Sequence, residues 1–486
     1  MKKAIVIGSG IAGISSAIRL AVKGFEVTIF DKNEYPGGKL SEVNQDGFRF
    51  DAGPSLFTMP QYVDELFQLA DKNPQDYFQY EKQTTACHYY WNDGTVFNAP
   101  SSTDEFANEA NKVFGENKEN INKKFEKASY INDKIGQLFL EQSLHKPSNF
   151  LNLPTLKGLL SIPKLDINKS LHTANQRDLD HPKLVQLFDR YATYNGSNPY
   201  QTPGIMGIIP HFEHNVGTFF PVKGMVSITK SLVKLAQELG VKFKLGEEVV
   251  EIEMHSNLAK GVKTVKGFWE ADVIISNMDV FFTYRKLLPN FKAPEKVLSR
   301  ERSSSALIFY WGMDAVFEQL DLHNIFFSDD YKKEFEDIFN NTTEVNDPTI
   351  YIHISSKVKK DDAPEGKENW FVMINTPPKG DLNWEQYVAN ARTKIIQKLS
   401  QRLNRDIGSL ILNESILDPR SIESKTMSYQ GSLYGTSSND KYAAFLRHPN
   451  FSKKIKNLYF VGGSAHPGGG IPLCLLSAKI AVDHVN

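Results

Sequence analysis

The sequence lacks several features that mark whole classes of protein. Only two cysteines, Cys87 and Cys474, occur among its 486 residues, which excludes a disulfide framework and a cysteine-based zinc site and is typical of a reducing compartment. Lysine and arginine total 56 and aspartate and glutamate 57, a net charge of −1 that gives no basis for nucleic-acid binding. The longest apolar run, around residues 306–313, is far shorter than the ~18 residues that span a bilayer. Any membrane contact is therefore expected at the protein surface.

What is present is typical of an ordinary globular protein. Hydrophobic residues make up 41% of the chain and charged residues 23%, which excludes disordered, collagenous and coiled-coil proteins. The first twenty residues superficially resemble a signal peptide. However, glycines interrupt the apolar stretch, Arg19 follows it, and there is no cleavage site between small residues. We therefore expect a strand, a turn and a helix here, in a cytoplasmic protein.

The N-terminal segment carries a glycine motif in a defined structural setting. Lys3–Ile7 is a β-branched run expected to form a buried parallel strand, and residues 11–23 are expected to form a helix. Gly8 and Gly10 lie between the strand and the helix, and Gly13 lies in the first turn of the helix. Gly8 permits a tight turn, Gly10 lets the backbone approach a pyrophosphate, and Gly13 lets helix and strand pack closely. This pattern predicts a dinucleotide-binding site.

The next strand supplies the acidic residue that such a site needs. Residues 26–30 are expected to form the second strand, and Asp31 ends it. Asp31 can accept hydrogen bonds from both ribose hydroxyls, which disfavours a 2′-phosphorylated cofactor. The phosphates are expected at the start of the helix, near the backbone N–H groups of Ile11 and Ala12. The motif alone serves both NAD and FAD.

The segment after Asp31 resembles a known family, and this resemblance favours one of the two cofactors. Residues 37–39 (GGK) and 48–55 (FRFDAGPS) resemble the flavoprotein superfamily that includes amine oxidases and phytoene desaturases. The resemblance implies that FAD is the cofactor and that these loops run along it. The superfamily more often has Glu at Asp31 and Arg at Lys39, and Lys39 lacks the forked guanidinium geometry. The cofactor-binding residues implied here are Lys32, Gly38, Lys39, Gly53, Pro54 and Ser55.

A second glycine-rich motif lies near the end of the chain. Residues 457–463 (NLYFVGG) are expected to form a strand and a glycine turn, and residues 473–485 a helix. Between them, HPGGGIP at 466–472 resembles the HPGxGIP signature of bacterial-type carotenoid desaturases. A glycine turn that leads into a helix places backbone N–H groups where the flavin gains negative charge on reduction. The residues implied are Gly462, Gly463, Gly470, Ile471 and Pro472.

Other segments extend the resemblance over nearly the whole chain. Residues 219–239, 271–279 and 431–435 match further segments of these desaturases in the same order, and 242–250 resembles the strand whose end contacts adenine, at Val249. The implied fold class is α/β: a Rossmann-like FAD-binding domain with an interleaved α+β substrate domain.

This resemblance also implies how the chain is divided. The FAD-binding domain is expected to be discontinuous, from 1–75, 215–290 and 430–486. The substrate-binding domain would then comprise 76–214 and 291–429, with strands at 306–311 and 349–354.

One helical region is a candidate for membrane contact. Residues 111–170 are rich in lysine and include the apolar sequence FLNLPTLKGLLSIP at 150–163. Apolar residues beside lysines are typical of a patch on a membrane surface. A helical cap with its apolar face packed inward gives the same pattern, and both readings stay open. A membrane surface is expected as a partner because the implied substrate is a lipid, which places the protein on the inner face of the membrane.

The implied chemistry needs little from acid–base side chains. Polyene C–H bonds are non-acidic, so hydride transfer to flavin N5 is the plausible first step, and proton loss from the delocalised cation follows. The protein positions the C–H bond and excludes water. HExxH, Walker A and GxSxG motifs are absent, so no metal site is expected and the catalytic residues are unknown. For each titratable candidate a structural role is favoured, with His466 the best placed; the candidates are Asp189, Arg190, His211, His214 and His466.

The sequence also bears on the substrate. Residues 53–60 (GPSLFTMP) resemble the branch that desaturates 1-hydroxycarotenoids at the 3,4 position, whereas phytoene-acting relatives have aromatic residues here. Leu56 and Thr58 are smaller and suit a polar end group. We therefore expect a 1-hydroxycarotenoid 3,4-desaturase, with phytoene desaturase as the main alternative and flavin amine oxidase as the alternative of another class. Quinone or oxygen is the expected electron acceptor.

Overall fold

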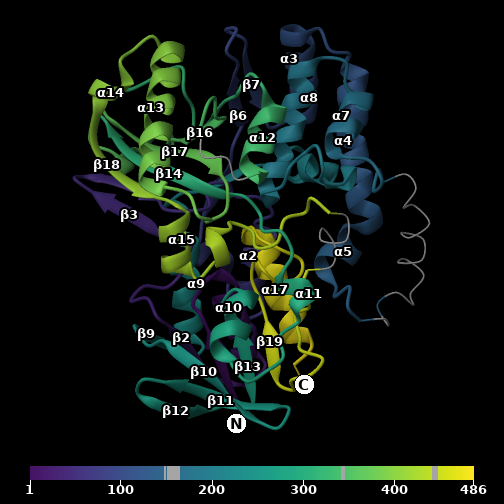
Figure 1. Cartoon of the computed structure of the whole chain (residues 1–486), viewed down its shortest axis with the longest axis vertical. Helices are drawn as coiled ribbons and strands as arrows, with labels where there is room; N and C mark the ends of the chain where they lie inside the picture. Colours follow the sequence, from purple (N-terminus) through teal and green to yellow (C-terminus); the bar gives the residue numbers. More distant parts are fainter. Residues whose placement is uncertain (147–148, 150–164, 341–344, 441–446, 486) are drawn as a thin grey trace.

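Two large β-sheets organise the molecule. The computed structural model describes residues 1–146, 149, 165–340, 345–440 and 447–485. One sheet occupies the lower half of the view in Figure 1 and the other the upper half, with helices packed on both. The α/β fold class is confirmed.

The lower sheet has five parallel strands in the order β19-β13-β1-β2-β9. Its strands come from distant parts of the chain: β1 (Lys3–Ile7), β2 (Glu26–Asp31), β9 (Lys242–Leu245), β13 (Val273–Ser276) and β19 (Leu458–Phe460). All four residues of β13 are buried, as expected for a strand covered on both faces. The strand order, with β1 between β2 and β13, is that of a Rossmann-like fold.

Helices from both ends of the chain cover this sheet. Helix α1 (Ile11–Val22) packs against α17 (Ile471–Asp483) and α9 (Val226–Glu238), and α2 (Gln61–Gln68) contacts all three. Below them in Figure 1 lies an antiparallel sheet of β10 (Val249–His255), β11 (Leu258–Thr264) and β12 (Gly267–Glu270). The N-terminal and C-terminal motifs therefore belong to neighbouring helices.

The upper sheet has seven strands in the order β18-β14-β17-β16-β15-β6-β7, antiparallel except for the β15–β6 pair. Its strands are β6 (Thr85–Tyr90), β7 (Val96–Pro100), β14 (Ser305–Met313), β15 (His323–Phe326), β16 (Ile350–His353), β17 (Glu368–Thr376) and β18 (Ile411–Leu417). The expected strands at 306–311 and 349–354 are confirmed. All nine residues of β14 are buried, which explains the longest apolar run in the sequence.

Helices flank the upper sheet on both sides, as Figure 1 shows. On one side lie α13 (Trp384–Leu403) and α14 (Ile407–Leu410); on the other lie α3 (Thr103–Phe114), α4 (Lys118–Ile131), α7 (Leu171–Asp178), α8 (Pro182–Asp189) and α12 (Tyr331–Phe339). The shorter elements are β3 (Glu42–Gln45), β4 (Phe48–Asp51), β5 (Tyr80–Lys82), β8 (Phe219–Pro221), α5 (Gln137–Glu141), α10 (Val280–Phe282), α11 (Glu295–Leu298) and α15 (Pro419–Thr426).

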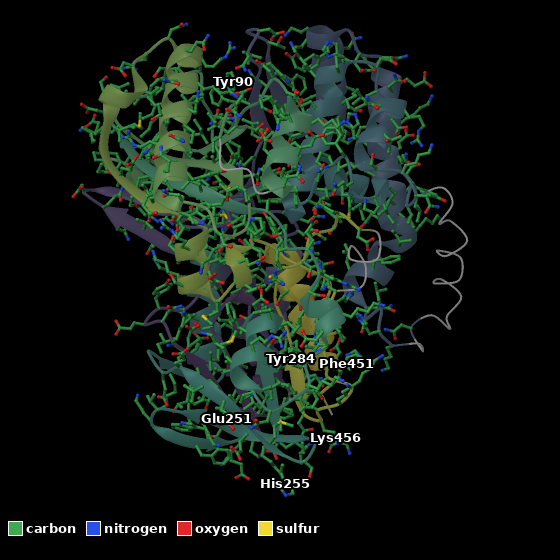
Figure 2. The ribbon with its side chains drawn as sticks, in the orientation of Figure 1. Tyr90, Glu251, His255, Tyr284, Phe451 and Lys456 are labelled. Atoms are coloured by element: carbon green, nitrogen blue, oxygen red, sulfur yellow. The ribbon has the colours of Figure 1, made fainter. Side chains whose placement is uncertain are left out.

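Each half has its own hydrophobic core. Trp311 is fully buried in the upper half, where Tyr90 stacks on Phe326 with ring centroids 4.5 Å apart. In the lower half, Tyr284 stacks on Phe460 at 5.5 Å. Figure 2 labels Tyr90 and Tyr284 at these two places. The two sheets therefore pack separately and can enclose a space between them.

The lysine-rich region is described only in part. Helices α4 and α5 confirm its helical character as far as Glu141, while the apolar segment 150–163 lies outside the described residues. Among the residues that the structure describes, no helix is both long and apolar enough to cross a bilayer.

A buried ion network ties the β3–β4 hairpin to both halves. The Arg49 guanidinium contacts Glu42 at 2.9 Å, Asp362 at 2.8 Å and Asp51. Asp51 and Asp362 are 1% and 0% exposed, and Asp51 also accepts a hydrogen bond from the Met225 N–H. Asp51 depends on Arg49 for charge compensation because it lies out of reach of water, whereas Asp362 also pairs with Lys359 at 2.7 Å.

We expect Arg49→Met to destabilise the protein by about 3–5 kcal/mol, because it leaves the buried carboxylate of Asp51 without its cation and removes one of the two cations paired with Asp362. Urea unfolding followed by circular dichroism measures the loss. Arg285→Met is the matched control, since Arg285 pairs with Glu295 at the exposed surface, and we expect it to leave the unfolding midpoint nearly unchanged. Equal losses in both variants would contradict this account.

Candidate functional site

One large cavity lies between the two sheets, at the carboxyl ends of the parallel strands, and has a volume of about 930 Å³. Ligands of open parallel sheets bind at this edge. Every predicted cofactor residue except Gly13 lines it: Gly8, Gly10, Ile11, Ala12, Asp31, Lys32, Gly38, Lys39, Gly53, Pro54, Ser55, Val249, Gly462, Gly463, Gly470, Ile471 and Pro472. The fold thus brings residues from three separate stretches of sequence to one place.

The glycine turn after β1 is packed as the motif predicts. Gly8 has φ +97°, a conformation that side chains disfavour. A Cβ on Gly13 would lie 2.1 Å from the Gly8 carbonyl oxygen, so Gly13 supports the turn from behind rather than facing the cavity. Gly10 leaves the backbone open on the cavity side. Together they form a cradle that fits a pyrophosphate at the start of α1.

Asn277, at the end of β13, is a cavity residue that the sequence analysis did not single out. Its Oδ1 accepts a hydrogen bond from the Gly13 N–H at 3.2 Å, and its Nδ2 donates to the Val461 carbonyl at 3.2 Å. A Cβ on Gly10 would lie 2.7 Å from the same Oδ1. Asn277 therefore joins the glycine turn to the C-terminal strand. Asn277 lies in segment 271–279, which resembles a segment of the desaturases, and this resemblance could have identified it as a site residue.

Asp31 lies where the motif places the ribose acid. Its Oδ2 accepts hydrogen bonds from the Ser9 N–H and hydroxyl, both at 2.7 Å, and its Oδ1 accepts from the Asn33 N–H at 2.9 Å. A carboxylate has about four lone-pair positions. Asp31 thus keeps acceptor capacity toward the cavity while its orientation is held by the glycine turn.

The two lysines predicted at the site make backbone contacts. Lys39 Nζ donates to the carbonyls of Ser432 at 3.2 Å and Leu433 at 2.9 Å, and burial lowers its pKa to about 8. Lys32 Nζ donates to the Ser424 carbonyl. Lys39 therefore keeps a positive charge at neutral pH and lies between the cavity and the late glycine turn.

The C-terminal motif lines the cavity beside the first glycine turn. A Cβ on Gly462 would lie 3.9 Å from the Ala12 Cβ, which places this turn against the start of α1. Gly470 ends the loop and α17 begins at Ile471. Gly470, Ile471 and Pro472 all line the cavity at this helix start.

Of the five titratable candidates, only Arg190 lines the cavity. Asp189 Oδ2 lies 2.6 Å from His172 Nδ1, and His214 Nε2 lies 2.9 Å from the Tyr191 hydroxyl. These contacts are structural. His211 also lies outside the cavity lining.

His466 does not face the cavity, although the sequence motif makes it the best placed of the five. Its Nε2 lies 2.8 Å from the Gln142 carbonyl oxygen, so that it anchors the loop. Burial lowers its pKa to about 4.

The upper sheet lines the cavity with apolar side chains that include Ile308, Ile325, Phe371 and Met373, and Leu56 joins them from the loop after β4. Thr58 lines the cavity as well. Polar groups line this chamber too, among them Ser55, His323 and Tyr351 and the paired Arg190 and Glu213. Such a chamber suits a long hydrophobic molecule with few polar groups.

Fold and cavity together define a class: proteins that bind a dinucleotide at a Rossmann-like sheet, next to a hydrophobic substrate chamber in a second sheet. Residues 11–486 match the family described as flavin containing amine oxidoreductase. The chain belongs to this family, and its cofactor is FAD. The glycine cradle, Asp31 and the extended cavity fit FAD.

Several curated relatives match almost the whole chain. A 1-hydroxycarotenoid 3,4-desaturase of Flavobacterium sp. (strain P99-3) is 54% identical over 483 residues, which is 99% of each chain. A phytoene desaturase of Fusarium fujikuroi is 29% identical over all of this chain and 89% of its own.

Among solved structures, an oxidoreductase from Methanosarcina mazei has a TM-score of 0.63 at 15% identity, with 99% of this chain and 100% of that chain covered. The likeness shows a shared fold.

We expect Gly13→Ala to lower the flavin bound per protein molecule by about tenfold or more, a change of ~1.4 kcal/mol, because its methyl group would force α1 away from the Gly8 carbonyl. Visible flavin absorbance relative to protein concentration measures it. Gly380→Ala is the matched control, because that glycine is exposed and its Cβ would meet only one atom, at 3.9 Å. Full flavin content in Gly13→Ala would contradict the packing argument.

Proposed function

We propose that the protein is an FAD-dependent carotenoid desaturase that introduces a 3,4 double bond into a 1-hydroxycarotenoid. The observation that carries the proposal is one cavity that joins the dinucleotide cradle to an apolar chamber. The 54% identity to a 1-hydroxycarotenoid 3,4-desaturase supports this substrate class.

The cavity suits a reaction that needs positioning and exclusion of water. The substrate loses a hydride from one carbon and a proton from its neighbour, and the electron pair of the second C–H bond becomes the new double bond. Bound flavin supplies the hydride acceptor at N5. The apolar side chains, Ile308 and Met373 among them, hold the polyene and keep water away from the cation. The released proton needs only a weak base or water.

The alternative substrate classes have less support. The phytoene desaturase of Fusarium fujikuroi is 29% identical, well below the 54% of the 3,4-desaturase. Leu56 and Thr58 both line the cavity, which supports a substrate with a polar end group. An amine oxidase would share the fold and cofactor, so the choice between amine and carotenoid is tested by turnover.

The division of the chain is also part of the proposal. Residues 1–75, 215–290 and 430–486 would form the FAD-binding domain, and residues 76–214 and 291–429 the substrate-binding domain. Every predicted cofactor residue would contact FAD except Gly13, which would act through the packing of the turn.

We further propose that the protein works as a peripheral protein on the inner face of the membrane and passes electrons to a quinone or to oxygen. The lipid nature of the substrate supports this location. Two lysines of α4, Lys118 and Lys123, are exposed, and exposed lysines favour anionic lipid surfaces.

We expect the flavin-loaded protein, in liposomes that contain a 1-hydroxylated carotene, to form a product lighter by two hydrogen atoms with a longer chromophore. Liquid chromatography with absorbance and mass detection measures it. Conversion of phytoene alone would support the phytoene alternative. Peroxide release from amines, with no carotenoid product, would support an amine oxidase.

We expect the protein to co-sediment with vesicles of phosphatidylglycerol and phosphatidylethanolamine, and less so as salt rises above 0.15 M, where the Debye length is about 8 Å. Neutral phosphatidylcholine vesicles are the control. A protein that stays in the supernatant with all vesicles would contradict the membrane location.

A further inference from the structure

Three polar side chains form a chain of hydrogen bonds on the wall of the apolar chamber. The Tyr351 hydroxyl lies 2.8 Å from Ser55 Oγ and 2.8 Å from His323 Nδ1. All three residues, hereafter the polar triad, line the cavity. His323 and Tyr351 stand on neighbouring strands β15 and β16, while Ser55 belongs to the loop after β4. The triad therefore joins the upper sheet to the segment proposed to contact the cofactor.

The imidazole of His323 keeps one ring nitrogen free. His323 is 3% exposed, and its Nε2 has no hydrogen-bond partner within the part of the chain that the structure describes. Burial lowers the pKa of His323 to about 4, so the ring is neutral at physiological pH. A neutral imidazole has one donor and one acceptor nitrogen. Because His323 lines the cavity, this nitrogen is available to a ligand in the chamber.

A neighbouring cluster of polar groups behaves differently, because its members mostly satisfy one another. Arg190 Nη2 donates to the Tyr89 hydroxyl at 2.7 Å. The carboxylate of Glu213 accepts from the hydroxyls of Tyr191, at 3.0 Å, and Tyr194. The buried charges are thus compensated within the protein. Arg190 Nε in this cluster also lacks a partner among the described residues, but among those residues His323 is the histidine that lines the cavity and has an unpartnered ring nitrogen.

We propose that His323, held in place by Tyr351 and Ser55, binds the C1 hydroxyl group of the substrate and selects hydroxylated carotenoids over plain hydrocarbons. A hydroxyl group both donates and accepts, so it pairs with Nε2 in either tautomer. C1 is two bonds from C3, so a group that binds the hydroxyl also positions the C3–C4 bond that reacts. This inference rests on the proposed function and assigns its specificity to the polar triad.

The experiment compares two substrates that differ in one group: a 1-hydroxylated carotene and the same carotene with hydrogen at C1. Sites built to hydrogen-bond a hydroxyl reject analogues without it strongly. We expect the flavin-loaded wild type to prefer the hydroxylated compound in kcat/KM by about a hundredfold or more. His323→Phe and Tyr351→Phe should reduce this preference by about tenfold or more, through lower kcat/KM for the hydroxylated compound only.

Tyr310→Phe is the matched control. Tyr310 also lines the cavity, but its hydroxyl donates to the Ala52 carbonyl at 2.6 Å, so its loss should affect both substrates alike and leave their ratio unchanged. Flavin absorbance verifies that each variant is folded and loaded. Quenching of tryptophan fluorescence measures the binding of each compound. Tyr351→Phe should bind the hydroxylated compound more weakly than the wild type does, and should bind the analogue equally well.

The outcomes separate the two proposals. Equal turnover of both compounds by the wild type, or an unchanged ratio in Tyr351→Phe, would overturn this inference and leave the carotenoid desaturase intact. No turnover of either compound by the flavin-loaded wild type would refute the proposed function, and this inference with it.

Discussion

The side-chain amide of Asn277 joins segments that are hundreds of residues apart. It accepts a hydrogen bond from the Gly13 N–H and donates one to the Val461 carbonyl, and so links the N-terminal helix to the C-terminal strand. The close approach works only because Gly10 and Gly462 have no side chains, since a Cβ on either would lie within 3 Å of the Asn277 amide. The cavity exists because these turns meet at one edge of the parallel sheet.

The cavity combines two kinds of wall with different physical tasks. The wall formed by the parallel sheet presents helix starts, backbone N–H groups and Asp31, which suit a charged dinucleotide. The wall formed by the upper sheet presents aliphatic and aromatic side chains, which suit a polyene and exclude water. A desaturation needs little more than this contact, because the chemistry belongs to the cofactor. This explains why the conspicuous histidine of the HPGGGIP motif, His466, has an anchoring role.

Most of the secondary structure near the cofactor could be predicted from the sequence, because it depends on local patterns. The strands at residues 3–7 and 26–30, and the helix beginning at Ile11, follow from β-branched runs, glycine spacing and helical periodicity, and the structure has them with bounds that differ by one residue. The order of the strands in the upper sheet could not be predicted in the same way. Its order places β15 beside β6, strands more than two hundred residues apart, and no local pattern specifies that pairing.

The sequence by itself determined the cofactor class, a dinucleotide, and which residues are expected around it, because a phosphate cradle requires glycine at fixed spacing and an acid at the end of the next strand. Family resemblance extended this to the C-terminal turn. Only the tertiary structure decided which polar groups face the chamber. Asn277 belongs to a matched segment in which no pattern distinguished it from its neighbours. His323 and Tyr351 lie 28 residues apart, in two strands without a recognisable motif. Their meeting depends on strand pairing and burial, which no spacing in the chain encodes.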